Sequence, residues 1–339
     1  MHRIVLIFFF LSGFSSLVFE VLWERMLMQV FGSTTFAIST LLTAFMAGLA
    51  LGSYLGGKIA DRLQHPLRVY GLLEGSIGLY ALLVPTLLAQ LPSVYGLFFD
   101  YFLENFYLFS LLRFIAVFFI LILPTTLMGA TLPIVSQWIS RHETLFQGSI
   151  GLLYGMNTLG ACTGCFAAGF VLLPSFGLST TNLMFAISNF VLCAIVLLSR
   201  RTILSNARLE RDRDREAEEL QALESIGEVV EVRTIPSALR KQALLFFALF
   251  GALSMCYQVL WTRAYVIVLG SSTYSFTVIL VSFLIGLSAG SALLSLRVRR
   301  IRRPLYWLGV TQLLLAAFAT LTFFTIDRLP ELLFHRLRE

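Results

Sequence analysis

Three polar side chains inside long apolar runs are the first candidates for chemistry: Glu20, Arg113 and Gln258. Ionisable groups within a membrane are expensive, and they usually mark a binding site or a buried pair. If helices bring the three together at similar depth, Glu20 provides the counter-charge for a cationic or zwitterionic solute. In the alternative interpretation, Glu20 pairs with Arg113 or Arg25 and only fixes the packing of the helices.

A second set of charges lies toward the side of the membrane that carries most arginines. Glu74 is expected on a helix there, and a structural pair with Arg68 or the loop arginines is favoured over a role as a gate charge. Asp61 and Arg62 follow a glycine-rich helix end and are also candidates for gating or structural charges.

Two aromatic–basic pairs recur along the chain, Trp23 with Arg25 and Trp261 with Arg263. An indole sits well among lipid headgroups, and an arginine there extends its charge toward water. We therefore expect all four residues to be interface anchors.

Motifs for enzymatic, metal or cofactor chemistry are missing from the sequence. Cys162-Thr-Gly-Cys165 is a lone CxxC in an apolar, glycine-rich segment, and the four histidines show no ligand spacing. No G-x-G, P-loop or G-x-S-x-G occurs. We expect no catalytic residue, no metal and no cofactor.

The elements that must position these residues are membrane helices. The chain is 58% hydrophobic and 13% charged, whereas soluble proteins are roughly 25% charged. The net charge of +6 comes from arginines at the ends of apolar runs, so it does not indicate nucleic-acid binding. Nine helices of suitable length are expected, at 4–24, 34–57, 68–91, 107–128, 147–172, 178–199, 242–261, 272–296 and 304–326. The turn Pro174-Ser-Phe-Gly177 separates the fifth from the sixth. Arginine placement predicts a multi-pass protein of the inner (plasma) membrane with a cytoplasmic N-terminus.

The chain also repeats itself after a shift of 238 residues. Between 13–53 and 251–291, 16 of 41 positions are identical. Both copies start on the same side of the membrane, so the repeat is parallel. We expect a first six-helix repeat at 1–199, a cytoplasmic charged linker at 200–241 and a partial second repeat of three helices at 242–339.

The linker has two interpretations, a solvated connection or a docking helix for a cytoplasmic partner. Arg208–Glu224 is expected to be a charged surface helix, and Glu228–Ile235 extended or loose. Within the membrane, the steps Gly48–Gly52 and Gly286–Gly290 predict close helix packing. Pro85, Pro124 and Pro133 are expected to kink their helices.

Residues 12–62 resemble the opening of the membrane part of bacterial fused MFS/spermidine synthase proteins. Three motifs carry the resemblance: E-V-L-W-x-R, F-G-S-T and G-L-A-L-G-S. Residues 251–291 resemble the start of the second half in that family. Gly57 to Asp61-Arg62 is similar to the loop signature of the major facilitator superfamily, with Leu63-Gln64-His65 in place of the usual continuation.

The resemblance implies an all-α, major-facilitator-like fold and a link to polyamine chemistry. Full-length members carry an aminopropyltransferase-like domain, and no residue of it is found here, so an enzyme is not expected. The first hypothesis is a membrane protein that binds or transports a polyamine or other cationic solute. The others are a scaffold that tethers a synthase domain or a partner supplying the missing helices, and an inactive fragment of a longer fusion.

Overall fold

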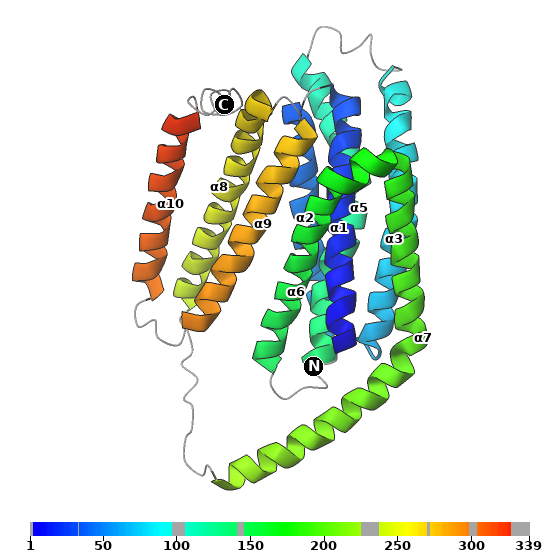
Figure 1. Cartoon of the computed structure of the whole chain (residues 1–339), viewed down its shortest axis with the longest axis vertical. Coiled ribbons are helices and arrows are strands. Elements are labelled where there is room, and N and C mark those ends of the chain that lie inside the picture. The colour runs from blue at the N-terminus through cyan, green and yellow to red at the C-terminus, as the bar shows by residue number, and fades with distance from the viewer. Residues whose placement is uncertain are drawn as a thin grey trace, which may run out of the picture.

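A computed structural model of the chain describes residues 3–32, 34–96, 106–140, 146–224, 237–269, 272–297 and 304–326, and these residues form helices that run side by side (Figure 1). The prediction of an all-α protein is confirmed. The helices are α1 (Arg3–Phe31), α2 (Thr34–Ala60), α3 (Pro66–Gly96), α5 (Phe106–Ser140), α6 (Phe146–Ala167), α7 (Leu173–Glu224), α8 (Ser237–Leu269), α9 (Ser272–Arg297) and α10 (Pro304–Ile326), with a π-helical turn at Ala168–Leu172 joining α6 to α7.

Each of the nine predicted segments lies in a helix of the described chain. Seven stretches are long and apolar enough to cross a membrane. One of them, Gly151–Ser199, holds two of the predicted helices, because Gly177 leaves the helical conformation with φ 73° and turns the chain back. The apolar part of α10, Tyr306–Thr322, is shorter. The turn predicted at Pro174–Gly177 is thus confirmed at its glycine.

Several helices are longer than predicted, since a charged residue near a membrane face does not end a helix. The first helix was expected to end at residue 24, but α1 continues to Phe31, where Gly32 has φ 63° and its N–H bonds to the Met28 carbonyl at 3.0 Å. The helices α3 and α5 likewise run through their internal prolines, among them Pro85, Pro124 and Pro133.

The helix α7 extends well past its apolar part. It continues to Glu224, and Figure 1 shows this charged extension projecting beyond the bundle at the end where the N-terminus lies. The predicted surface helix at Arg208–Glu224 is therefore confirmed as helical. The segment Glu228–Ile235 lies outside the described residues.

Small residues set the distances between the helices of the first repeat. A side chain added at Gly52 would collide with the Thr126 carbonyl of α5, and one at Gly48 with the Thr125 hydroxyl. Gly160 of α6 lies equally close to the backbone of Phe10 on α1. The prediction of close packing at the Gly48–Gly52 step is therefore confirmed.

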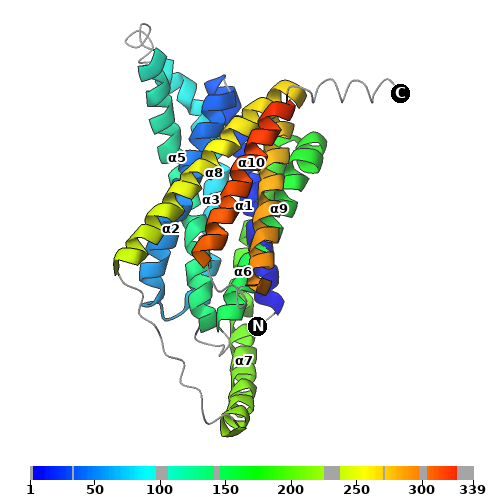
Figure 2. The ribbon, with the colours of Figure 1, turned by 90° about the vertical axis from the view of Figure 1, so that its left-hand side faces the viewer.

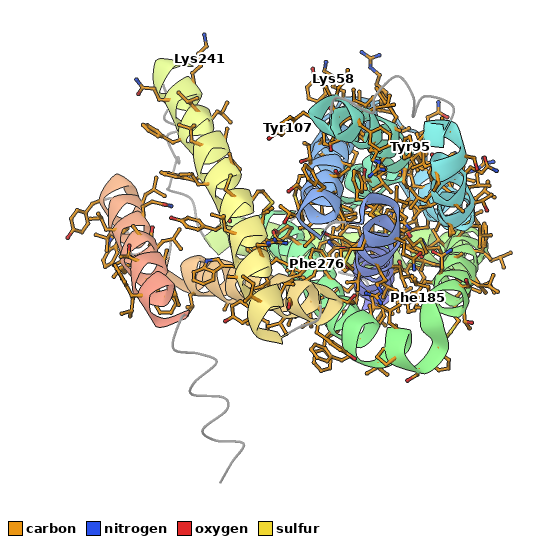
Figure 3. The ribbon with its side chains drawn as sticks, turned by 90° about the horizontal axis from the view of Figure 1, so that it is seen from above. Lys58, Tyr95, Tyr107, Phe185, Lys241 and Phe276 are labelled. Atoms are coloured by element: carbon orange, nitrogen blue, oxygen red, sulfur yellow. The ribbon has the colours of Figure 1, made fainter. Side chains whose placement is uncertain are left out.

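The matching step of the second copy is open. At Gly286 and Gly290 an added side chain would meet no atom of the described residues within 4 Å, so the close packing predicted for this step is wrong there. By contrast, the first turns of α9 are buried against α6 and the π-helical turn that follows it, where Gly169 lies directly on Thr277. Viewed from above, α8 and α10 stand beside the tightly packed first six helices (Figure 3), and a second view shows α8 and α10 crossing in front of them (Figure 2).

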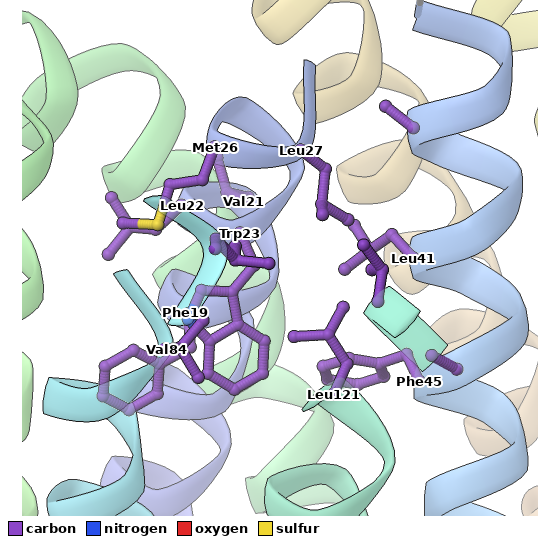
Figure 4. Packing of buried hydrophobic residues seen from close by; sticks show 14 of the residues in the cluster. Phe19, Val21, Leu22, Trp23, Met26, Leu27, Leu41, Phe45, Val84 and Leu121 are labelled. Atoms are coloured by element: carbon purple, nitrogen blue, oxygen red, sulfur yellow. The ribbon is translucent and has the colours of Figure 1, made fainter. Parts of the chain in front are cut away.

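The main core lies where α1 passes between α2, α3 and α5. Phe19, Leu22 and Trp23 of α1 are fully buried there, and they pack with Phe45 of α2 and Leu121 of α5 (Figure 4). The helix that carries Glu20 is therefore rigidly placed by its apolar neighbours.

The open and closed glycine steps generate a matched test. Gly52→Leu should destabilise the protein by about 1–3 kcal/mol or more, because overpacking forces two backbones apart. Gly290→Leu, the same change at the equivalent repeat position, should leave stability unchanged. Thermal unfolding in detergent measures both, and equal effects of the two substitutions would contradict the packing described here.

Candidate functional site

Two carboxyl groups of α1 are buried one helical turn apart. Glu20 is 1% exposed and Glu24 is 0% exposed. One oxygen of Glu20, Oε1, and both carboxyl oxygens of Glu24 are buried without a hydrogen-bond partner. Residues four apart share a helix face, so the two groups form one acidic stripe. Sequence reasoning missed Glu24 because the helix was expected to end there, although the spacing to Glu20 could have shown it.

Arg113 does not lie with Glu20. Its guanidinium carbon lies 4.0 Å from the ring centre of Phe109 and 5.6 Å from that of Tyr95, which is a cation–π arrangement between α5 and α3. No ion pair joins Arg113 to Glu20, both of which lie in the described chain. The alternative in which Arg113 pairs with Glu20 is therefore not found, and the convergence of the two residues around a solute stays a prediction. Aromatic faces hold the Arg113 charge instead.

The surroundings of Glu20 come from α6 and α9. Cys165 of α6 interacts electrostatically with Glu20. Its thiol donates a weak hydrogen bond to the backbone oxygen of Thr277 on α9 at 3.9 Å. The Thr277 hydroxyl oxygen is itself buried without a partner. Glu20 thus lies beside the contact between the first repeat and α9. Within the described residues, no three His, Cys, Asp or Glu side chains gather as metal ligands.

Gln258 of α8 is the repeat counterpart of Glu20, and Thr262 is the counterpart of Glu24. Gln258 is 4% exposed, and both polar atoms of its amide lack a hydrogen-bond partner. Its neighbour Val259 packs on the same core as α1. Gln258 forms no hydrogen bond with Glu20, and its predicted role in a shared binding site stays a prediction.

The four predicted anchors have different surroundings. Trp23 is fully buried and stacks on Phe19 with ring centres 5.7 Å apart, so its prediction as a headgroup anchor is wrong. The indole of Trp23 packs in the apolar core around α1 and does not reach the lipid headgroups. Arg25, Trp261 and Arg263 are exposed or half-buried, and their role as anchors stays a prediction.

The two repeats meet at the end of the bundle opposite the N-terminus. There Arg25 of α1 donates a hydrogen bond to the Thr273 hydroxyl at 3.3 Å, and Phe170 stacks on Tyr274 at 5.4 Å. At the other end, Phe247 in the first half of α8 is 80% exposed. The repeats therefore touch at one end and diverge at the other, as Figure 1 also shows for α9 and α6.

Glu74 is a structural group in its present surroundings. It is 1% exposed and accepts a hydrogen bond from the Ser12 hydroxyl at 2.5 Å, which joins α3 to α1. Arg68 is exposed and forms no ion pair with it, so the favoured pair of Glu74 with Arg68 is wrong. Asp61 and Arg62 are exposed in the turn after α2, and their gating role stays a prediction.

The Ser12–Glu74 bond predicts a stability effect. Ser12→Ala should cost about 1–3 kcal/mol of folding free energy, because it removes one hydroxyl donor from the buried Glu74 carboxyl, which then keeps only its interaction with Tyr70. The control Ser76→Ala removes an exposed hydroxyl that bonds only within α3, at the Leu72 carbonyl, and should cost little. The double variant Ser12→Ala/Glu74→Met should regain most of the loss in a thermal unfolding assay. No recovery in the double variant would mean that Glu74 has another partner.

Comparison with known proteins agrees with this helical architecture. The family model described as Major Facilitator Superfamily matches residues 4–333. No curated protein and no solved structure matches the chain. The family match covers nearly all of the described helices and agrees with their apolar, membrane-spanning stretches. The chain is a multi-pass membrane protein that belongs to the Major Facilitator Superfamily.

Proposed function

We propose that this transporter-like protein binds and carries an organic cation, with Glu20 as the counter-charge. One observation carries the proposal: Glu20 is buried near the contact of α6 with α9, and within the described residues no cationic side chain forms an ion pair with it. Glu24 adds a second carboxyl one turn away. The family match supports transport in general, and the acidic stripe supports the charge of the solute.

The physical argument rests on the cost of an unpaired buried charge. Moving an isolated carboxylate out of water costs far more than a typical protein can spare, so such a group takes up a proton or meets a cation. Structural carboxylates avoid this cost by pairing, as Glu74 does with Ser12. Glu20 and Glu24 have no such donor at three of their four oxygens. A buried carboxyl such as that of Glu20, with an oxygen that no donor reaches, is what an empty or protonated cation site presents.

The spacing of the two carboxyls favours a solute with more than one positive charge. Four residues of helix rise about 6 Å, which is a distance that a short diamine can bridge. The resemblance to polyamine synthase fusions points the same way, and it makes spermidine a reasonable probe. We further propose that the protein lies in the inner membrane with its N-terminus in the cytoplasm, as the arginine distribution favours.

Spermidine binding tests the proposal. The full chain in detergent should bind spermidine, and Glu20→Gln should weaken binding at least about tenfold, which corresponds to about 1.4 kcal/mol. Glu74→Gln is the matched control, because it changes another buried carboxyl outside the stripe, and it should bind normally. Equilibrium dialysis with labelled spermidine measures all three.

Equal affinity of the wild type and Glu20→Gln would overturn the role of Glu20. No binding by the wild type would overturn the polyamine as solute. The second candidate function, a membrane scaffold, would then gain support, because the α7 extension to Glu224 presents a helical surface beyond the bundle.

A further inference from the structure

A pocket of about 320 Å³ lies at the end of the bundle where the two repeats meet. Its walls come from three parts of the chain: Arg25 of α1, the corner between α6 and α7 at Leu173–Gly177, and the first turn of α9 at Thr273 and Tyr274. Figure 1 places this corner at the end of the bundle opposite the N-terminus. The pocket is separate from Glu20, Glu24 and Gln258, which do not line it.

The polar part of the pocket suits an anion. Arg25 is the charged residue of its described lining, and its guanidinium is exposed and has one hydrogen bond, to Thr273. Glu24 is the next residue, and its buried carboxyl interacts electrostatically with Arg25, but no hydrogen bond joins the two side chains. The guanidinium therefore keeps most of its five N–H groups for a ligand. The first turn of α9 adds the positive end of a 26-residue helix.

The rim of the pocket is apolar and faces the surroundings of the bundle. Leu173, Pro174, Leu178 and Tyr274 line the pocket, and Phe170, which is 39% exposed, stacks on Tyr274 beside it. Gly177, with its φ of 73°, holds the chain open at the corner without a side chain to fill the space. A ligand that fits this surface has a phosphate for Arg25 and an apolar tail for the aromatic rim.

We propose that this pocket binds the phosphate headgroup of a phospholipid from the membrane leaflet at that end. A phosphate between Arg25 and the first turn of α9 touches both repeats at once. A ligand that binds one arrangement of a protein more tightly stabilises that arrangement. The bound lipid therefore favours the state in which the repeats are closed at this end. The proposal does not depend on which solute the protein carries.

The repeat provides a matched control residue. Arg263 is the counterpart of Arg25, at the same place on α8, and it is exposed. General attraction of lipid phosphates to arginine would involve both residues equally. If the lipid binds in the pocket, lipid binding should depend on Arg25 and not on Arg263.

Native mass spectrometry of the full chain with added phosphatidylglycerol tests the proposal. The wild type and Arg263→Gln should each retain one lipid, and Arg25→Gln should retain about tenfold less, since one charge-assisted contact is lost. Arg25→Lys, which keeps the charge but not the planar fork, should be intermediate. Each variant is first checked for a single elution peak, and the lipid should raise the melting temperature of the wild type more than that of Arg25→Gln.

Two results would overturn the proposal. Equal lipid retention by Arg25→Gln and Arg263→Gln would mean that the lipid contacts are general. Displacement of the lipid by millimolar inorganic phosphate, with the same rise in melting temperature from phosphate alone, would mean that the pocket takes a soluble anion. If Arg25→Gln fails to elute as a single peak, the comparison of Arg25→Lys with Arg263→Lys decides by the same criterion.

Discussion

A carboxyl group enclosed by apolar side chains must be neutralised, and this constraint organises the first half of the chain. Three such groups lie on α1 and α3, and they meet the constraint differently. Glu74 accepts a hydrogen bond from Ser12 and so joins two helices. Glu20 and Glu24 are left with unpartnered oxygens beside the second repeat. The apolar core around α1 holds the two carboxyl groups in place, so their unpartnered oxygens follow from the packing of the helices and not from side-chain mobility.

Close helix packing makes this enclosure possible. Without a hydrophobic driving force between helices in lipid, small residues and van der Waals contact must bring them together. Gly48 and Gly52 do this between α2 and α5, and Gly160 between α1 and α6. The second copy has glycines at the same positions, Gly286 and Gly290, but no other helix of the described structure packs closely on them. The described part of the second repeat therefore adds contacts mainly at one end, where Thr277 meets α6, and the two repeats diverge toward the other.

The sequence alone predicted the helices and the close packing at Gly48–Gly52, because apolar length and small-residue spacing act locally, but the packing predicted at Gly286–Gly290 is not found in the described structure. It did not predict the neighbours of polar residues, which depend on how helices face one another. Trp23 looked like a headgroup anchor, but the core of α1 buries it. Arg113 looked like the partner of Glu20, but the rings of Phe109 and Tyr95 hold it. Glu24 was overlooked because the first helix was expected to end at the charged residues 24 and 25, whereas α1 continues past them to Phe31.

The most direct measurement is the reactivity of the three buried carboxyls toward dicyclohexylcarbodiimide, an apolar reagent that modifies protonated carboxyl groups within membranes. Modified residues are identified by peptide mass spectrometry of the full chain, with and without spermidine. The account predicts that Glu20 is modified and that spermidine protects it, while any modification of Glu74 is the same with and without spermidine. Modification of Glu20 that spermidine leaves unchanged would contradict the assignment of Glu20 as the counter-charge for a cationic solute.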